Sequence, residues 1–164
     1  MPRRSCLVRF DRQLITPSGV GVLSSCMPKS NGLPRISRRR STIQGHGVFA
    51  LEPINKNKRI IDYAGELITN EQSKDREDRY LTNNCIWVFR VNRRWNRDAA
   101  VGGNIARFIN HSCKPNCWIE IADRTIWIRA SRPIEKGEEL TYDYSTDGDK
   151  TIPCHCHPGC KTKL

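Results

Sequence analysis

The apolar residues of this chain occur mainly in short runs that alternate with polar residues, which is the pattern of half-buried β-strands. Runs of this kind predict strands at residues 47–51, 59–63, 85–91, 118–121 and 125–129. The last two flank Ala122-Asp123-Arg124, which predicts a hairpin turn, and Lys56-Asn57 predicts a turn between the first two. Many short strands separated by turn residues predict a mainly β fold.

One short helix interrupts this pattern. Thr69 is followed three residues later by Gln72, which is the spacing of a capping box at a helix N-terminus. The polar residues that follow predict a helix through about Arg79.

The length of 164 residues suits a single domain. No run of about 18 apolar residues is present, which argues against a membrane span. The basic N-terminus also lacks the apolar stretch of a secretory leader. We therefore expect an intracellular protein.

Positive charge is concentrated near the N-terminus. Residues 1–44 hold nine Lys and Arg against one acid, in a chain of formal net charge +11. Residues 1–34 show no clean periodicity, so we expect a basic, flexible arm. Two interpretations of the arm stay open: a solvated leader, or a contact for nucleic acid or another acidic surface. Arg38-Arg39-Arg40 is a weak signal for a nuclear address or a nucleic-acid contact.

Two polar stretches carry more information than the strands around them. Residues 107–117 read RFINHSCKPNC, and residues 139–144 read ELTYDY. Both stretches resemble the signature motifs of the SET domain family. Residues 45–50, residues 63–66, and Cys154-His155-Cys156 with Cys160 resemble further motifs of that family, in the family's order.

The resemblance covers about residues 35–160 and implies a fold. That fold is mainly β and β-clip-like, with several small sheets and a C-terminal pseudoknot. The resemblance divides the chain into the basic arm, a SET domain with a variable insert, and a zinc segment similar to the post-SET region, at residues 1–34, 35–148 (insert about 70–97) and 149–164. Cys6 and Cys26 are too few for a pre-SET zinc cluster, so the resemblance is to a minimal SET domain.

The family transfers a methyl group from S-adenosylmethionine to a protein lysine and releases S-adenosylhomocysteine. The amine must be neutral to attack, and an apolar channel lowers the pKa of a lysine from its reference value of about 10.4. By resemblance, Tyr144 orients the amine and Tyr63 lines the lysine channel. Tyr142 would limit the space for methyl groups, which predicts mainly monomethylation with some dimethylation.

The resemblance also implies a cofactor site and a zinc site. The cofactor site would hold the methyl donor, partly through main-chain contacts, with His46, Gly47, Tyr80, Arg107, Asn110 and His111. Eight cysteines in an intracellular chain indicate metal more than disulfides. The zinc ligands would be Cys113, Cys154, Cys156 and Cys160, which would pin the C-terminus over the active site. Three residues separate Cys156 from Cys160 where the family usually has four, so His155 or His157 is an alternative ligand. We expect Cys117 to be a packed thiol.

Substrate, partners and oligomeric state stay open. The substrate would be a lysine-bearing protein, such as a histone tail or a ribosomal protein. The compartment would be the nucleus or chromatin if the protein is eukaryotic or delivered into a host, and the cytoplasm otherwise. The alternative function is a non-catalytic, zinc-stabilised module that binds nucleic acid through its basic arm. A nucleic-acid methyltransferase is disfavoured, because no glycine-rich Rossmann loop is visible.

Overall fold

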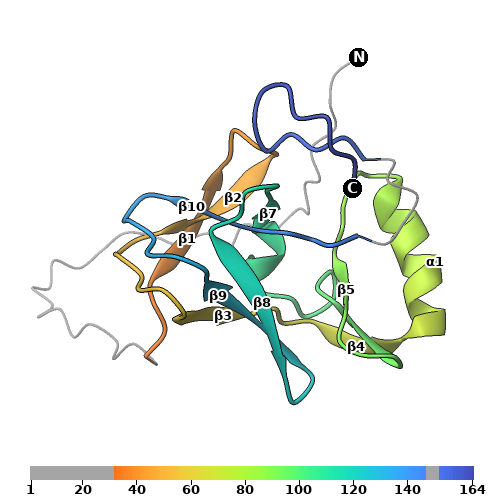
Figure 1. Cartoon of the computed structure of the whole chain (residues 1–164). Coiled ribbons are helices and arrows are strands. Elements are labelled where there is room, and N and C mark those ends of the chain that lie inside the picture. Colours follow the sequence, from red (N-terminus) through yellow and green to blue (C-terminus); the bar gives the residue numbers. More distant parts are fainter. Residues whose placement is uncertain (1–31, 147–151) are drawn as a thin grey trace, which may run out of the picture.

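The structure is a computed structural model that describes residues 32–146 and 152–164. Three small β-sheets enclose one apolar core, and a helix flanks the third sheet (Figure 1). This arrangement confirms the predicted mainly β fold of several small sheets. Most of the predicted basic arm and the predicted boundary at residue 148 lie outside the described residues.

The first sheet contains the two signature motifs. Its strands, in spatial order, are β1 (Ile36–Arg40), β2 (His46–Ala50), β10 (Glu139–Tyr142) and β7 (Asn110–His111). β10 runs parallel to β7, with Thr141 opposite Asn110 and Tyr142 opposite His111. The last strand of the chain therefore lies between β2 and β7, which is the pairing that the predicted C-terminal pseudoknot requires. β1 was not predicted, because its arginines do not follow the apolar pattern of a strand.

The second sheet contains the predicted hairpin. Its strands are β3 (Arg59–Asp62), β9 (Thr125–Ala130) and β8 (Cys117–Ala122). Asp123 and Arg124 connect β8 to β9 with φ angles of 48° and 62°. Such left-handed angles match the right-handed twist of the flanking strands, so the tight turn sets the register of the hairpin.

The third sheet and the helix span the predicted insert of about residues 70–97 and begin just before it; we call them the insert. They comprise β4 (Glu66–Thr69), α1 (Asn70–Leu81), β5 (Val88–Arg90) and β6 (Trp95–Asp98), with β6 central in the sheet. The predicted capping box is confirmed, since Gln72 N donates to Thr69 Oγ1 and Thr69 N donates to Gln72 Oε1. β5 is shorter than the predicted strand at 85–91, because Cys85 N donates to Tyr80 O and closes the helix end instead.

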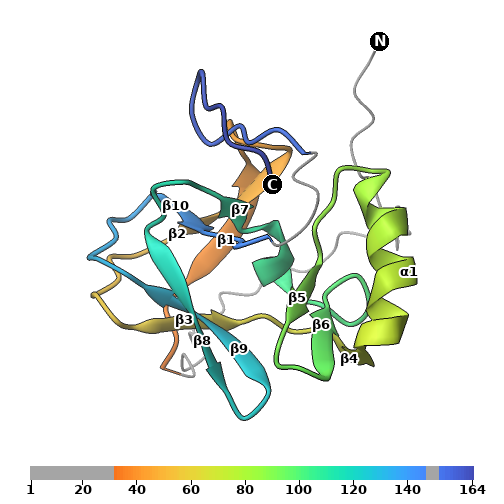
Figure 2. The same cartoon turned by 45° about the vertical axis from the view of Figure 1, so that its right-hand side comes forward.

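The C-terminal segment closes on itself after the three sheets. Ile152 and Leu164 exchange two main-chain hydrogen bonds of 3.1 and 2.8 Å. In both views the segment lies over one end of the first sheet, near the turn between β1 and β2 (Figures 1 and 2). A short 3₁₀ helix, η1 (Ile105–Phe108), leads into β7. Across the described residues, no helix has the length and apolar character needed to cross a membrane.

Candidate active site and cysteine cluster

Four aromatic residues meet at the junction of the three sheets. We call them the tyrosine cluster: Tyr63, Phe89, Tyr142 and Tyr144. The Phe89 ring lies among the other three, with centroid distances of 5.0 Å to Tyr63, 5.7 Å to Tyr142 and 5.3 Å to Tyr144. The fold thus brings together the three tyrosines that the sequence predicted to be catalytic. Sequence analysis missed Phe89, whose only signal is an aromatic position inside a predicted strand.

The hydroxyl groups of the cluster are neutral hydrogen-bonding groups. Tyr144 Oη donates to Ile109 O at 2.7 Å, and Tyr63 Oη donates to Trp87 O at 3.1 Å. Burial raises the pKa of Tyr63, Tyr142 and Tyr144 above the ordinary value, so all three stay protonated at neutral pH. Among the described residues, no partner lies within hydrogen-bonding distance of the Tyr142 hydroxyl. The cluster can therefore orient a ligand through hydroxyl oxygens, but it offers no charged base.

Asn110 is held by a polar group that the sequence analysis did not single out. Its Nδ2 donates to Glu139 Oε1 at 2.8 Å and to His46 O at 3.0 Å, and Ser41 Oγ donates to the same carboxylate. A Cβ at Gly47 would lie 2.1 Å from Glu139 Oε1, so only glycine leaves room for the carboxylate in this place. The side chain of Asn110 is thus oriented from within the protein. β7 is the last strand in the order of its sheet, so the main chain on its outer edge has no strand partner in the part of the chain that the structure describes.

His111, which lies on β7, contacts both Tyr144 and Cys113. Its Nδ1 lies 3.3 Å from Tyr144 N, and its Nε2 lies 3.5 Å from Cys113 Sγ. A main-chain N–H can only donate, so Nδ1 accepts and the proton of the neutral ring sits on Nε2, facing the sulfur. Burial lowers the pKa of His111, against the opposing effect of Asp143, which agrees with a neutral ring. The His111 ring therefore contacts both the tyrosine cluster, at Tyr144, and the predicted zinc site, at Cys113.

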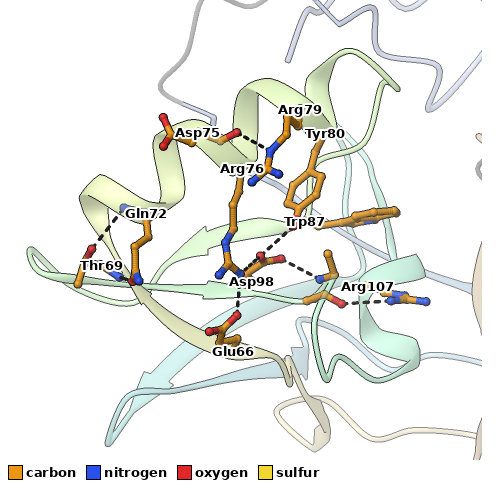
Figure 3. A network of polar contacts seen from close by, with 12 residues as sticks. Glu66, Thr69, Gln72, Asp75, Arg76, Arg79, Tyr80, Trp87, Asp98 and Arg107 are labelled. Carbon is orange, nitrogen blue, oxygen red and sulfur yellow. Dashed lines mark hydrogen bonds and ion pairs between the residues drawn. The ribbon is translucent and has the colours of Figure 1, made fainter.

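Arg107 and Tyr80, both predicted cofactor contacts, lie on either side of Trp87 (Figure 3). The Arg107 guanidinium stacks 4.9 Å from the Phe108 centroid and 5.7 Å from the Trp87 centroid. Its Nη1 donates to Ala99 O at 3.2 Å, but its buried Nε has no partner among the described residues. A buried donor without a partner is uncommon, and a ligand or a water could supply the missing acceptor; Arg97 Nε is a second such donor among the described residues.

Tyr80 belongs to a closed polar network around a fully buried carboxylate. We call this the Asp98 network: Glu66, Arg76, Tyr80 and Asp98. Asp98 accepts from Arg76 at 2.7 Å, from Tyr80 at 3.0 Å and from the main chain of Ala100 at 2.8 Å, and Arg76 also reaches Glu66 (Figure 3). The network fixes α1 on β4 and β6. The hydroxyl of Tyr80 is occupied within the protein, and its predicted cofactor contact stays a prediction.

The four predicted zinc ligands converge. The Sγ atoms of Cys113, Cys154, Cys156 and Cys160 all lie within 4.8 Å of one another, and Cys113 Sγ lies 3.9 Å from Cys154 Sγ and 3.8 Å from Cys160 Sγ. A tetrahedral Zn²⁺ with Zn–S bonds of about 2.3 Å requires S···S distances of about 3.8 Å, so the four thiols lie close to the arrangement that this ion needs. Hydrogen bonds from Thr162 lower the pKa of Cys160 to about 6, which favours the thiolate that binds metal.

The two histidines of the C-terminal segment lie outside the sulfur cluster, although they share a cavity with Cys154 and Cys160. His155 and His157 line a cavity of about 250 Å³ between this segment and Thr42 in the turn from β1 to β2. Neither belongs to the sulfur cluster, so the shortened cysteine spacing needs no histidine in place of a thiol. Cys117, the other cysteine of the signature, is 1% exposed and is packed in the core as predicted.

Comparison with known proteins assigns the family. The model of the SET domain matches residues 45–145. The chain is 45% identical over 125 residues to the human protein named histone-lysine N-methyltransferase 2D. This match covers 71% of this chain and 2% of the human protein. It is 44% identical over 135 residues to the Yarrowia lipolytica protein named histone-lysine N-methyltransferase, H3 lysine-4 specific, which covers 76% of this chain and 12% of that protein.

A third relative agrees with these two. The chain is 45% identical over 131 residues to the Drosophila melanogaster protein named histone-lysine N-methyltransferase trr, which covers 74% of this chain. The chain spans a small part of each of these relatives, only 5% of the Drosophila protein. The shared part contains the tyrosine cluster, Asn110 and His111, and on this match the chain belongs to the SET domain family.

Proposed function

We propose that this chain is a protein-lysine N-methyltransferase that uses S-adenosylmethionine and acts mainly as a monomethylating enzyme. The observation that carries the proposal is the tyrosine cluster, in which Tyr63, Tyr142 and Tyr144 surround Phe89 directly beside β7. Family membership and the names of the relatives support the same activity.

The predicted cofactor residues are suited to the methyl donor. The outer edge of β7 offers main-chain groups to an adenine ring, and the buried Nε of Arg107 lacks a partner that a polar ligand can supply. Glu139 and Gly47 act indirectly, because they fix the amide of Asn110. When bound, S-adenosylmethionine supplies a methyl group on a positively charged sulfur, which is electrophilic.

The residues of the cluster prepare the lysine amine. Burial away from water among these rings disfavours the ammonium ion and so favours the neutral amine, whose extra proton leaves to solvent before the attack. Tyr144 donates its own proton to Ile109 O, so the lone pairs of its Oη can accept an N–H of the incoming amine. This contact aligns the nitrogen for in-line displacement. Most of the rate enhancement then comes from alignment in a dry channel.

The number of methyl groups depends on Tyr142. Its side chain is 1% exposed and packs 4.9 Å from the Tyr144 ring. Its hydroxyl has no partner among the described residues, so it is available to a water or to the amine itself. We infer that this polar contact, and the volume it occupies, disfavour a second and a third methyl group.

Zinc would support the site from the C-terminal side. The residues that would hold the ion are Cys113, Cys154, Cys156 and Cys160. A bound Zn²⁺ would act structurally, by joining the C-terminal segment to the residues that follow β7.

We further propose a histone as the substrate, because the relatives carry that word in their names. Chromatin would then be the place of action in a eukaryotic or host cell, and the cytoplasm otherwise.

The test is a methylation assay on the full, zinc-loaded chain with S-adenosylmethionine and core histones, read by mass spectrometry of lysines. We expect single methyl additions. Tyr144→Phe should lower kcat by about 100-fold or more, since it removes the oxygen that orients the amine. Its folding should change little, because one hydrogen bond contributes about 1 kcal/mol.

Trp118→Phe serves as the matched control, since Trp118 is 40% exposed on β8 and lies outside the tyrosine cluster. Equal activity of Tyr144→Phe and the native chain would refute the catalytic assignment. A folded, zinc-loaded chain that neither binds S-adenosylmethionine nor methylates protein would instead support the alternative, a non-catalytic binding module.

A further inference from the structure

β1 presents an unusual density of positive charge at a sheet edge. Within residues 32–146 and 152–164 its strand partner is β2, and it forms the outer strand of the first sheet (Figure 1). Three consecutive residues of this strand, Arg38, Arg39 and Arg40, are exposed. We call them the arginine ridge. Because strand residues advance about 3.4 Å each, Arg38 and Arg40 stand about 6.8 Å apart on one side, with Arg39 on the other.

Two of these side chains are held in place by aromatic rings. The Arg38 guanidinium lies 4.8 Å from the Phe108 centroid, and that of Arg39 lies 5.7 Å from the Phe49 centroid. Arg39 Nε also donates to Ser37 Oγ at 3.2 Å. The charges are therefore preorganised, which lowers the entropy lost when they bind a partner.

The charges of the ridge are not neutralised. Among residues 32–146 and 152–164, no carboxylate forms an ion pair with Arg38, Arg39 or Arg40. Elsewhere in the same residues, carboxylates pair with Arg35, Arg59, Arg76, Arg129 and Arg132. The positive charges of Arg38 and Arg40 also affect a neighbouring residue: together with burial, which is the larger cause, they lower the pKa of His46.

We propose that the arginine ridge binds the phosphodiester backbone of duplex DNA. Three unpaired guanidinium groups lie along this edge strand, two on one side and one on the other, and so complement a polyanion that approaches the edge. Guanidinium also matches phosphate geometry better than ammonium does. The Phe108 and Phe49 rings are engaged by the guanidinium groups of Arg38 and Arg39, and the bases of a single strand would have to displace these contacts in order to stack there. Single-stranded nucleic acid is therefore the poorer fit. The contact would be independent of sequence, since backbone contacts position a protein without reading bases.

This inference goes beyond the proposed catalytic function and does not depend on it. It also differs from the predicted role of residues 1–34, because it places the contact in the folded domain. If the ridge binds DNA, the domain itself carries an anchor for a substrate that is packaged with DNA.

The test measures binding of the full chain to a short fluorescein-labelled duplex by anisotropy at several salt concentrations. Each phosphate contact contributes about 0.9 to the slope of log K against log salt, so three contacts contribute about 2.7. The triple variant Arg38→Gln, Arg39→Gln, Arg40→Gln should lose most of this slope and bind at least about tenfold more weakly at low salt. The matched triple lysine variant of the ridge should keep it, because charge is retained.

The control removes the same charge elsewhere. Lys74, Arg93 and Arg94 are exposed on the insert, near the acids of α1, and their triple glutamine variant should keep the slope. If the ridge variant does not fold, the single Arg40→Gln variant replaces it, with an expected slope change of about 0.9.

Three results would overturn the proposal. The first is an unchanged slope in the folded ridge variant, which would assign binding to another part of the chain. The second is an equal loss in the insert variant, which would indicate net charge alone. The third is tighter binding to single strands or to anionic lipid vesicles than to the duplex.

Discussion

The tyrosine cluster and the Asp98 network each contain buried polar groups, but these groups differ in whether their hydrogen-bonding capacity is used within the protein. In the Asp98 network every named polar group has a partner: Asp98 receives three hydrogen bonds, and Arg76 reaches two carboxylates. In the tyrosine cluster the hydroxyl groups of Tyr63 and Tyr144 each donate one bond and keep free lone pairs. The hydroxyl of Tyr142 has no partner among the described residues.

This difference separates a structural role from a functional one. A buried network whose members satisfy one another holds α1 and the insert sheet in one arrangement. A buried group with unused hydrogen-bonding capacity costs stability unless a ligand or water completes it. The insert can therefore serve as a rigid wall that carries Phe89 into the cluster, while the cluster itself retains the capacity to bind.

The largest effect is expected from breaking the closed network. Asp98→Ala would leave Arg76, Tyr80 and the main chain of Ala100 without their acceptor. Loss of one partner of a buried ion pair costs about 3–5 kcal/mol, so the free energy of unfolding in urea should fall by that amount. Glu66→Gln is the control, because Glu66 is 43% exposed and its pair with Arg76 should contribute less than about 1 kcal/mol. Similar losses in both variants would contradict a closed, buried network.

The second largest effect is expected on zinc affinity, when one of the four clustered cysteines is replaced. Cys113→Ser should lower zinc affinity by more than about 100-fold, which exceeds the loss caused by removing an outer-shell partner. Cys117→Ala is the matched control from the same motif and should keep one zinc per chain. Metal content by mass spectrometry and a chelator competition measure both. Full zinc affinity in Cys113→Ser would remove Cys113 from the ligand set.

Alkaline pH tests the burial of the neutral tyrosines. The pKa of Tyr63 is raised in the folded chain, so the folded state keeps its proton at a pH where the unfolded state loses it. The resulting stability is full below about pH 10 and is lost as pH rises, by up to about 1.4 kcal/mol per pH unit. Urea unfolding of the native chain and of Tyr63→Phe should show a shallower decline in the variant. Parallel declines would show that Tyr63 titrates normally.

The smallest change in rate, with the clearest change in product, is expected at Tyr142. Tyr142→Phe removes the hydroxyl but leaves the ring that packs on Tyr144. Activity should stay within about tenfold, because the aligning contact of Tyr144 remains. The product should shift from monomethyl to dimethyl and trimethyl lysine in the mass spectrum. A native chain that already makes trimethyl lysine would contradict the proposed role of Tyr142.

The parts of the fold that the sequence predicted are those fixed by local rules. The hairpin at Asp123-Arg124 and the capping box at Thr69 follow from turn chemistry and from short-range hydrogen bonds, which a sequence displays directly. The strands β1 and β6 were not predicted, because pairing with neighbouring strands, rather than an apolar pattern in the sequence, makes them strands. Arg38 and Asn96 give no strand signal of their own.

The same reasoning explains the candidate site. Its predicted residues came from motif resemblance, and the structure brings the three tyrosines and the four cysteines together. Glu139, Ser41 and Asp98 were missed as structural partners because a lone carboxylate or hydroxyl in a sequence reads as a surface group. Only the fold shows that Asp98 is fully buried and that Glu139 occupies the space left by Gly47.

The position of His111 has a consequence for inhibitor chemistry. One nitrogen of its ring faces Cys113, and the other holds the main chain of Tyr144. In the metal-free chain, an electrophile or oxidant that modifies the Cys113 sulfur would remove the contact at Nε2 and leave the ring held through Nδ1 and Tyr144 N alone. The same reagent would remove one of the four proposed zinc ligands, and it needs no access to the lysine channel. Cys113 is exposed, so a small thiol-reactive compound can reach it from solvent when no metal is bound.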